Sequence, residues 1–182
     1  MPGVIRTSVG YAGGMKMDPT YKDLGDHTET IQIEYDPNQV SYRELVQVFW
    51  ESHDATHPSW SRQYMSIIFF HNRDQQKIAM ETRDLEALRR GRKVQTAITP
   101  YKMFYPAEDY HQKYRLKMHR DILEEYRSFY PAPEDLTSST SAARVNGYLA
   151  GEGDLIQFEK EAPSLGLSQE AIDKVRKTLS DY

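Results

Sequence analysis

Residues 28–50 combine a strand pattern, a turn and a helix start within one short stretch. Ile31 and Ile33 alternate with polar residues, which predicts a strand with one buried face. Ser41, followed three residues later by Glu44, forms the pattern of a capping box and predicts that a helix begins there. A strand followed directly by a helix favours folds in which helices cover a sheet.

Further elements are expected on both sides of this stretch. Apolar or β-branched runs predict strands at residues 4–12, 65–70 and 94–98, and helical composition predicts helices at residues 72–90 and 107–129. In the helix expected at 72–90, one stripe of large apolar residues is expected to face the core, namely Ile78, Leu85 and Leu88. The order of these elements predicts an α/β domain, an α+β two-layer arrangement around a mixed sheet.

The C-terminal third has a different composition. Residues 134–145 hold three Ser and two Thr, which predicts a linker. Residues 146–182 are expected to form a helical extension, since Ser168 can cap a helix whose apolar face consists of Ile172, Val175 and Leu179. The expected organisation is a domain at 1–133, a linker at 134–145 and a helical extension at 146–182.

Composition excludes several classes of function. The chain of 182 residues has no cysteine, which removes disulfides, thiolate metal sites and a cysteine nucleophile. The 23 Lys and Arg against 27 Asp and Glu leave a net charge of −4, which argues against nucleic acid as a partner. A mean hydropathy of −0.75 and the lack of a long apolar run argue against a membrane protein. No signal-peptide pattern opens the sequence, so secretion is not expected.

Chemistry-bearing residues gather in a few short segments. Glu29 stands at the start of an expected strand, where a carboxylate is either functional or simply solvent-facing. Tyr21 and Tyr64 flank loops, where they serve either as packing residues or as hydroxyl donors. The segments that hold or surround these residues are Gly10–Gly14, Pro19–Tyr21 with Gly25–Glu29, Arg62–Ser66 and Phe104–Gln112.

Taken together, these segments closely resemble the peptide methionine sulfoxide reductase A family. The resemblance runs from residue 2 to about residue 114 and includes Val48-Phe49-Trp50-Glu51 with His53-Asp54. It implies an α/β fold around a mixed sheet and reduction of the S epimer of methionine sulfoxide, free or in proteins, as a repair of oxidative damage. It also implies that thioredoxin or another thiol is the reductant, and that no cofactor or metal is needed.

The resemblance also implies site residues. Glu29 would be the proton donor, kept protonated by an aromatic pocket, and the hydroxyls of Tyr21 and Tyr64 would hold the sulfoxide oxygen. The partners implied are thioredoxin and methionine sulfoxide in peptides and proteins. The protein itself is expected to be a monomer in the cytoplasm or the mitochondrion.

The sequence departs from the family pattern at the nucleophile. The family's Gly-Cys-Phe-Trp-Gly motif would precede Pro2, and the chain does not contain it. The family's first central strand and crossover helix are therefore also expected to be missing, and the chain is expected to be inactive in isolation. Selenocysteine in place of the lost cysteine is one explanation. The family's second cysteine would follow Asn146-Gly147-Tyr148, where this chain has Leu149.

Other readings remain open at this point. A pseudo-enzyme could bind methionine or its sulfoxide without turnover, and an interaction module could dock a partner through the apolar stripe of its last helix. Ser66 shows no evident base that would make it a nucleophile. His53 and His57 have the spacing of a metal pair, but Pro58 argues against the helix that such a pair needs.

Overall fold

The computed structural model describes residues 1–182 and divides into two compact units. One unit, here called the sheet unit, consists of Val9–Ile31 and Asp36–Ala107. The other, here called the helical unit, consists of Met1–Ser8, Gln32–Tyr35 and Glu108–Tyr182.

The first part of the chain contains both strands and helices, and helices alone form the last part, so the predicted α/β class is confirmed. None of the helices combines the length and the apolar character that crossing a membrane requires. The strands are β1 (Val4–Ala12), β2 (Thr28–Tyr35), β3 (Ile67–Phe70), β4 (Ala97–Pro100) and β5 (Phe104–Pro106). The helices are α1 (Tyr42–Glu51), α2 (Arg73–Arg90), α3 (Tyr114–Lys117), α4 (Arg120–Phe129), α5 (Pro133–Ser138), α6 (Thr140–Tyr148), α7 (Leu155–Glu161) and α8 (Gln169–Ser180), with 3-10 turns η1 (Asp109–His111) and η2 (Ala162–Ser164).

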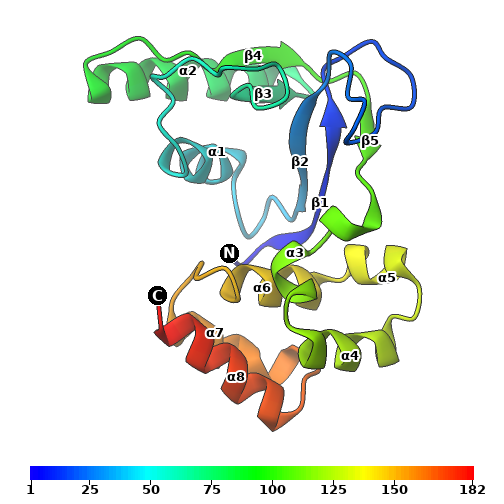
Figure 1. The fold of residues 1–182 in the computed structure, drawn as a ribbon. Helices are drawn as coiled ribbons and strands as arrows, with labels where there is room; N and C mark the ends of the chain where they lie inside the picture. Colours follow the sequence, from blue (N-terminus) through cyan, green and yellow to red (C-terminus); the bar gives the residue numbers. More distant parts are fainter. The chain divides into compact units, whose positions relative to one another are not determined.

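The strands form two small sheets (Figure 1). One has the order β2-β1-β5, and β5 runs antiparallel to β1 with Tyr11 opposite Tyr105. The other pairs β3 with β4 in parallel, with Ile68 opposite Ile98. Parallel neighbours need a crossover connection, and α2 supplies it between these two strands.

Helix α1 begins as the sequence predicts. The Ser41 hydroxyl accepts the Glu44 N–H at 3.2 Å, and the Glu44 carboxylate accepts the Ser41 N–H at 2.8 Å, so the capping box is confirmed. The helix buries one face in the core of the sheet unit, whose members are Val46, Trp50, Ala55, Ile68, Ala79 and Val94.

The orientation predicted for α2 is wrong. Leu85 and Leu88 are 59% and 79% exposed, whereas the buried face includes Glu86. The Glu86 carboxylate is buried because Arg89 and Arg90 pair with it, and these hydrogen bonds lower its pKa to about 2. Arg90 also donates to the carbonyl oxygen of Trp50 at 3.1 Å. The buried face of α2 thus carries Ala79, Thr82 and this paired carboxylate.

The linker predicted at residues 134–145 is helical instead. Pro133 stands in the first turn of α5, where a missing N–H costs nothing, and the Ser139 hydroxyl caps α6 by accepting the Ala142 N–H at 3.1 Å. Leu136 and Val145 are buried in the helical core. The Ser and Thr residues that suggested a linker are thus the caps and outer faces of two short helices.

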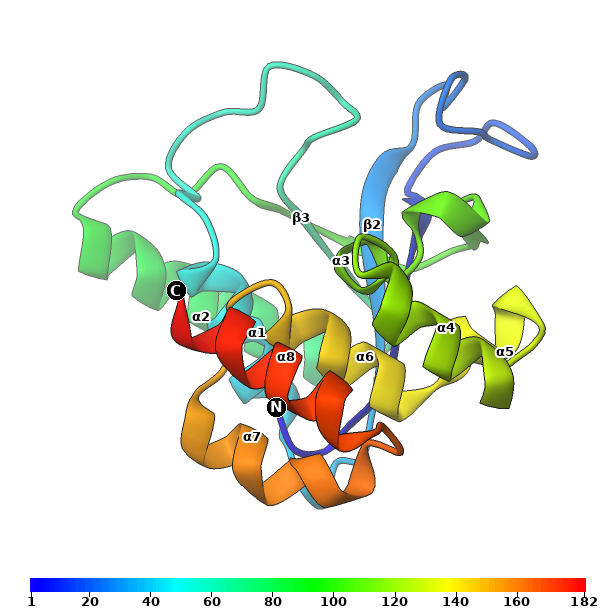
Figure 2. The same ribbon diagram turned by 60° about the horizontal axis from the view of Figure 1, so that its bottom comes forward.

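Helices α3 through α8 are labelled in Figure 2. They supply most of the apolar residues in the core of the helical unit. Ser168 caps α8 as predicted, by accepting the Ala171 N–H. Ile172, Val175 and Leu179 are 6%, 0% and 7% exposed, so the proposed docking stripe of α8 is already packed inside the unit. The interaction-module reading therefore loses the surface on which it depended.

The helix predicted at residues 107–129 is broken into η1, α3 and α4. The break precedes Tyr114, at Lys113, which adopts a left-handed φ of 50°. The Lys113 ammonium donates to the Thr7 carbonyl at 2.6 Å and to the Thr7 hydroxyl at 3.0 Å, and the residue is only 5% exposed. These bonds anchor the start of α3 within the helical unit.

Burial makes Lys113 a source of pH-dependent stability. Desolvation, with a contribution from Lys117, lowers its pKa from 10.5 to about 8. Between these values the unfolded chain holds a proton that the folded chain has lost, so the free energy of unfolding should rise with pH by about 3 kcal/mol. Denaturant titrations between pH 7.5 and 10.5 should show this slope in the wild type and lose it in Lys113→Met. The exposed Lys160→Met serves as control, and an equal slope in all three proteins would contradict the assignment.

Candidate functional site

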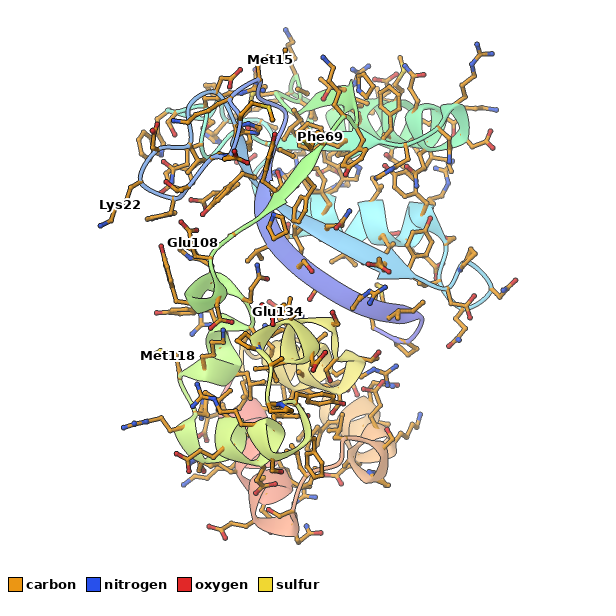
Figure 3. All side chains as sticks on the ribbon, turned by 90° about the vertical axis from the view of Figure 1, so that its right-hand side faces the viewer. Met15, Lys22, Phe69, Glu108, Met118 and Glu134 are labelled. Atoms are coloured by element: carbon orange, nitrogen blue, oxygen red, sulfur yellow. The ribbon has the colours of Figure 1, made fainter.

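The loop between β1 and β2 is closed by side chains near its end. The Asp26 carboxylate accepts the Met15 N–H at 2.9 Å and the Lys16 N–H at 3.2 Å, and these bonds hold the pKa of Asp26 below its usual range. Nδ1 of the buried His27 accepts the Gly14 N–H at 3.2 Å, so Nε2 carries the proton and donates to the Lys16 carbonyl at 2.8 Å. The loop is thus fixed at its base, while Lys22 extends away from it (Figure 3).

Arg62 ties this loop to the segment that precedes β3. Its Nε donates to the Asp26 carbonyl at 2.9 Å and its Nη2 to the Gly13 carbonyl at 3.0 Å. Its Nη1 donates to the Met65 sulfur at 3.0 Å. One guanidinium therefore links three points of the chain around the candidate site.

Glu29 is held by Gln63 through both main chain and side chain. The Glu29 N–H donates to the Gln63 carbonyl at 2.9 Å, and the Gln63 side-chain amide donates to Glu29 Oε1 at 2.7 Å. Next to this pair, the Thr28 hydroxyl donates to the Arg62 carbonyl at 2.9 Å. The Glu29 side chain is exposed, rather than enclosed in the aromatic pocket that the resemblance implies.

Tyr21 and Tyr64 form a hydrogen-bonded pair beside this carboxylate. The hydrogen bond to Tyr21, followed by burial and the negative charge of Glu29, raises the pKa of Tyr64. The ring of Trp60 lies 5.1 Å from the ring of Tyr64, centroid to centroid. The structure thus brings together all three residues that the sequence singled out.

This arrangement has a definite chemical capacity. Two phenolic hydroxyls can donate to one polar oxygen of a ligand, and a carboxyl beside them can transfer a proton to that oxygen. The sheet and helical units contain no group of three or more His, Cys, Asp or Glu residues that could hold a metal ion.

Two other sequence expectations concern the segment around β3. Ser66 does have a basic partner, contrary to expectation: its Oγ lies 2.9 Å from His53 Nε2, while His53 Nδ1 donates to the Phe49 carbonyl at 2.8 Å. His57 instead pairs with Asp54 at 2.8 Å, so the two histidines serve different partners. The Ser66–His53 contact joins the end of α1 to the start of β3.

Sequence reasoning gave no role to Arg62 or Gln63, although both stand directly before Tyr64. Arg62 and Gln63 join residues 26–29 to residues 62–65 by hydrogen bonds. These contacts depend on the fold, because the two segments are far apart in the sequence. A polar pair next to an expected site tyrosine was the available signal, but spacing alone does not say which segment it contacts.

Gly13 is a point at which this packing can be tested. Its φ is +84°, and a Cβ there would lie 2.6 Å from the ring of Phe69. Gly13→Ala should therefore lower the free energy of unfolding by roughly 2–4 kcal/mol, from backbone strain plus overpacking. Gly91→Ala is the matched control, since its φ is +62° with nothing within 4 Å of the added Cβ, and should cost about 1 kcal/mol. Equal losses in denaturant titrations would contradict the Phe69 contact.

Comparison with known proteins assigns the family. The family model described as peptide methionine sulfoxide reductase matches residues 1–141, and the chain belongs to that family. A second model, described as the helical domain of selenoprotein methionine sulfoxide reductase A, matches residues 132–180.

Individual relatives agree with this assignment. A peptide methionine sulfoxide reductase of Drosophila melanogaster is 44% identical over 169 residues, which cover 91% of this chain and 67% of that protein. Peptide methionine sulfoxide reductase A5 of Oryza sativa is 43% identical, with 82% of this chain and 61% of that protein covered. The solved structure of reduced Mxr1 from Saccharomyces cerevisiae matches with a TM-score of 0.60 and 30% identity, over 65% of this chain and 73% of that one. The chain thus spans about three fifths to two thirds of the length of these two sequence relatives.

Proposed function

We propose that this chain takes part in reducing the S epimer of methionine sulfoxide, free and in proteins, to methionine. The observation that carries the proposal is the cluster of Tyr21, Tyr64 and Glu29, with the carboxylate held by Gln63. Membership in the reductase family supports the choice of substrate.

The reaction assigns a role to each member of the cluster. Methionine sulfoxide and a thiol yield methionine and a sulfenic acid, so the sulfoxide sulfur is reduced while the thiol sulfur is oxidised. During attack by the thiolate, the sulfoxide oxygen gains negative charge. The hydroxyls of Tyr21 and Tyr64 stabilise this charge by donating hydrogen bonds, and the Glu29 carboxyl delivers the proton that the oxygen needs.

The nucleophile is not among these residues. The sequence has no cysteine, and a serine hydroxyl such as that of Ser66 is a poor nucleophile toward sulfoxide sulfur. The position after Asn146-Gly147-Tyr148 is occupied by Leu149, which is 1% exposed in the helical core. We therefore infer that a thiolate or selenolate from outside these 182 residues performs the attack, and that the chain by itself does not turn over substrate.

Reductant, compartment and assembly follow from this chemistry as parts of the proposal. A sulfenic acid must be reduced by thioredoxin or another thiol, which favours a reducing compartment such as the cytoplasm or the mitochondrion. Tyr21, Glu29 and Tyr64 all lie within one sheet unit, so action as a monomer, without a cofactor, is part of the proposal.

The lack of cysteine also favours one second candidate, a protein that binds methionine or its sulfoxide without turnover. A turnover assay with methionine-(S)-sulfoxide and dithiothreitol separates the two. We expect no methionine from the chain alone, and turnover from a version extended ahead of Pro2 by a segment with the Gly-Cys-Phe-Trp-Gly motif. Turnover by the chain alone would contradict the missing-nucleophile argument. Binding without turnover in the extended version would favour the second candidate.

A further inference from the structure

The two tryptophans of the chain lie in opposite environments. Trp50 is 4% exposed in the core of the sheet unit, whereas Trp60 is 83% exposed. The turn that carries Trp60 is held by local bonds, since the Ser59 hydroxyl donates to the Ser61 carbonyl at 2.7 Å and the Tyr64 N–H donates to the Ser61 hydroxyl at 3.4 Å. A large aromatic side chain is thus presented to solvent from an ordered turn.

Trp60 extends the aromatic surface of the candidate site. Its ring is tilted by 44° against that of Tyr64, which in turn is hydrogen-bonded to Tyr21. Trp60, Tyr64 and Tyr21 form a strip, defined here as the aromatic strip, whose members are 83%, 45% and 40% exposed. The strip begins beside the Glu29 carboxylate and ends at an indole that no part of the proposed reaction uses.

The dimensions of the strip match a polypeptide better than a free amino acid. The ring of Trp60 lies 5.1 Å beyond that of Tyr64, and consecutive Cα atoms of a peptide are about 3.8 Å apart. A sulfoxide held at Tyr64 therefore places a neighbouring residue of the same peptide within reach of the indole. Free methionine sulfoxide ends in its charged ammonium and carboxylate groups and has no side chain to put there.

The chemistry of the strip points to an apolar neighbour. Trp60 offers a ring face, and aromatic residues of this kind dominate binding surfaces. The closest cation in sequence, Arg62, already donates to Asp26, Gly13 and Met65, so its guanidinium is committed to the loop.

Resting on the proposed function, we propose that Trp60 is a specificity-determining residue that packs against an apolar or aromatic side chain next to methionine sulfoxide in a polypeptide. The chain then prefers oxidised methionine with such a neighbour over free methionine sulfoxide and over peptides with a small neighbour.

Calorimetric titration of the full chain tests this without any turnover. The ligands are free methionine-(S)-sulfoxide and three blocked tripeptides with a central methionine-(S)-sulfoxide: one with alanine on both sides, one with phenylalanine before the sulfoxide and one with phenylalanine after it. We expect at least one phenylalanine peptide to bind about 3- to 10-fold more tightly than the alanine peptide. Trp60→Ala should abolish this difference in Kd between the phenylalanine and alanine peptides and leave the Kd for free sulfoxide unchanged. Trp60→Phe should retain most of the difference.

Leu88→Ala is the matched control, because Leu88 is also a strongly exposed apolar residue, 79% exposed on α2. It should change none of the four Kd values. One result overturns this inference and leaves the proposed function standing: the wild type binds free sulfoxide, and Trp60→Ala does not alter the ratio of the Kd values for the alanine and phenylalanine peptides. No binding of any sulfoxide by the wild type overturns both.

Discussion

Glu161→Ala is expected to destabilise the helical unit by about 3–5 kcal/mol, because it removes a buried carboxylate that holds three partners. Glu161 is 6% exposed and accepts hydrogen bonds from the Tyr148 hydroxyl at 2.7 Å and from the side chain of Gln157. Arg144 pairs with the same carboxylate at 3.0 Å. Removing the carboxylate leaves the Tyr148 hydroxyl and the Arg144 charge without their partner between α6 and α7.

The same helix offers the control. Glu159 is exposed and pairs with Arg176, whose Nη2 donates to it at 3.1 Å. Glu159→Ala should cost no more than about 1 kcal/mol, because exposed ion pairs contribute little. Denaturant titrations followed by helical circular dichroism measure both variants. A loss for Glu161→Ala as small as that for Glu159→Ala would show that the buried cluster does not hold α6 to α7.

Glu29→Gln is expected to lower turnover by 10²- to 10⁴-fold in the cysteine-extended version of the chain, the range usual for loss of a positioned proton donor. Glutamine keeps the size of the side chain but cannot deliver a proton. It also places a second amide against the Gln63 amide, which donates to Glu29 Oε1 at 2.7 Å in the wild type. Since Tyr21 and Tyr64 remain, the effect should fall on kcat more than on KM.

Glu34→Gln is the matched control, because Glu34 lies on the same strand and makes only an exposed pair with Arg6 at 2.8 Å. Its kcat should stay within about twofold of the wild type, since exposed ion pairs of this kind contribute little. Steady-state kinetics with methionine-(S)-sulfoxide and dithiothreitol give both values. A Glu29→Gln variant with the turnover of Glu34→Gln would remove Glu29 from the mechanism.

The sequence predicts local features of this structure better than contacts between segments that are far apart in the chain. The capping box at Ser41 and the helix start at Ser168 depend on residues three positions apart, and both are confirmed. The grouping of Tyr21, Glu29 and Tyr64 was predictable only through family resemblance, because their proximity depends on Arg62 and Gln63 joining two distant segments.

The failures have physical causes of the same kind. Residues 134–145 suggested a linker because Ser and Thr are common in loops, yet Ser139 is a helix cap and Leu136 is a core residue. The orientation of α2 was mispredicted because the Glu86 carboxylate, paired with Arg89 and Arg90, is buried. Leu85 and Leu88 are exposed instead. The spacing of apolar residues does not indicate whether a charged residue will form ion pairs that allow it to be buried.

The most direct test of the central claim is calorimetric binding of methionine-(S)-sulfoxide to the full chain. The account predicts saturable binding that is stronger for the S epimer than for the R epimer or for methionine, and that is lost in Tyr21→Phe combined with Tyr64→Phe. These substitutions remove only the two hydroxyls and leave the rings in place. Equal binding of both epimers and of methionine, or S-epimer binding that survives the double substitution, would contradict the claim that these hydroxyls receive the sulfoxide oxygen.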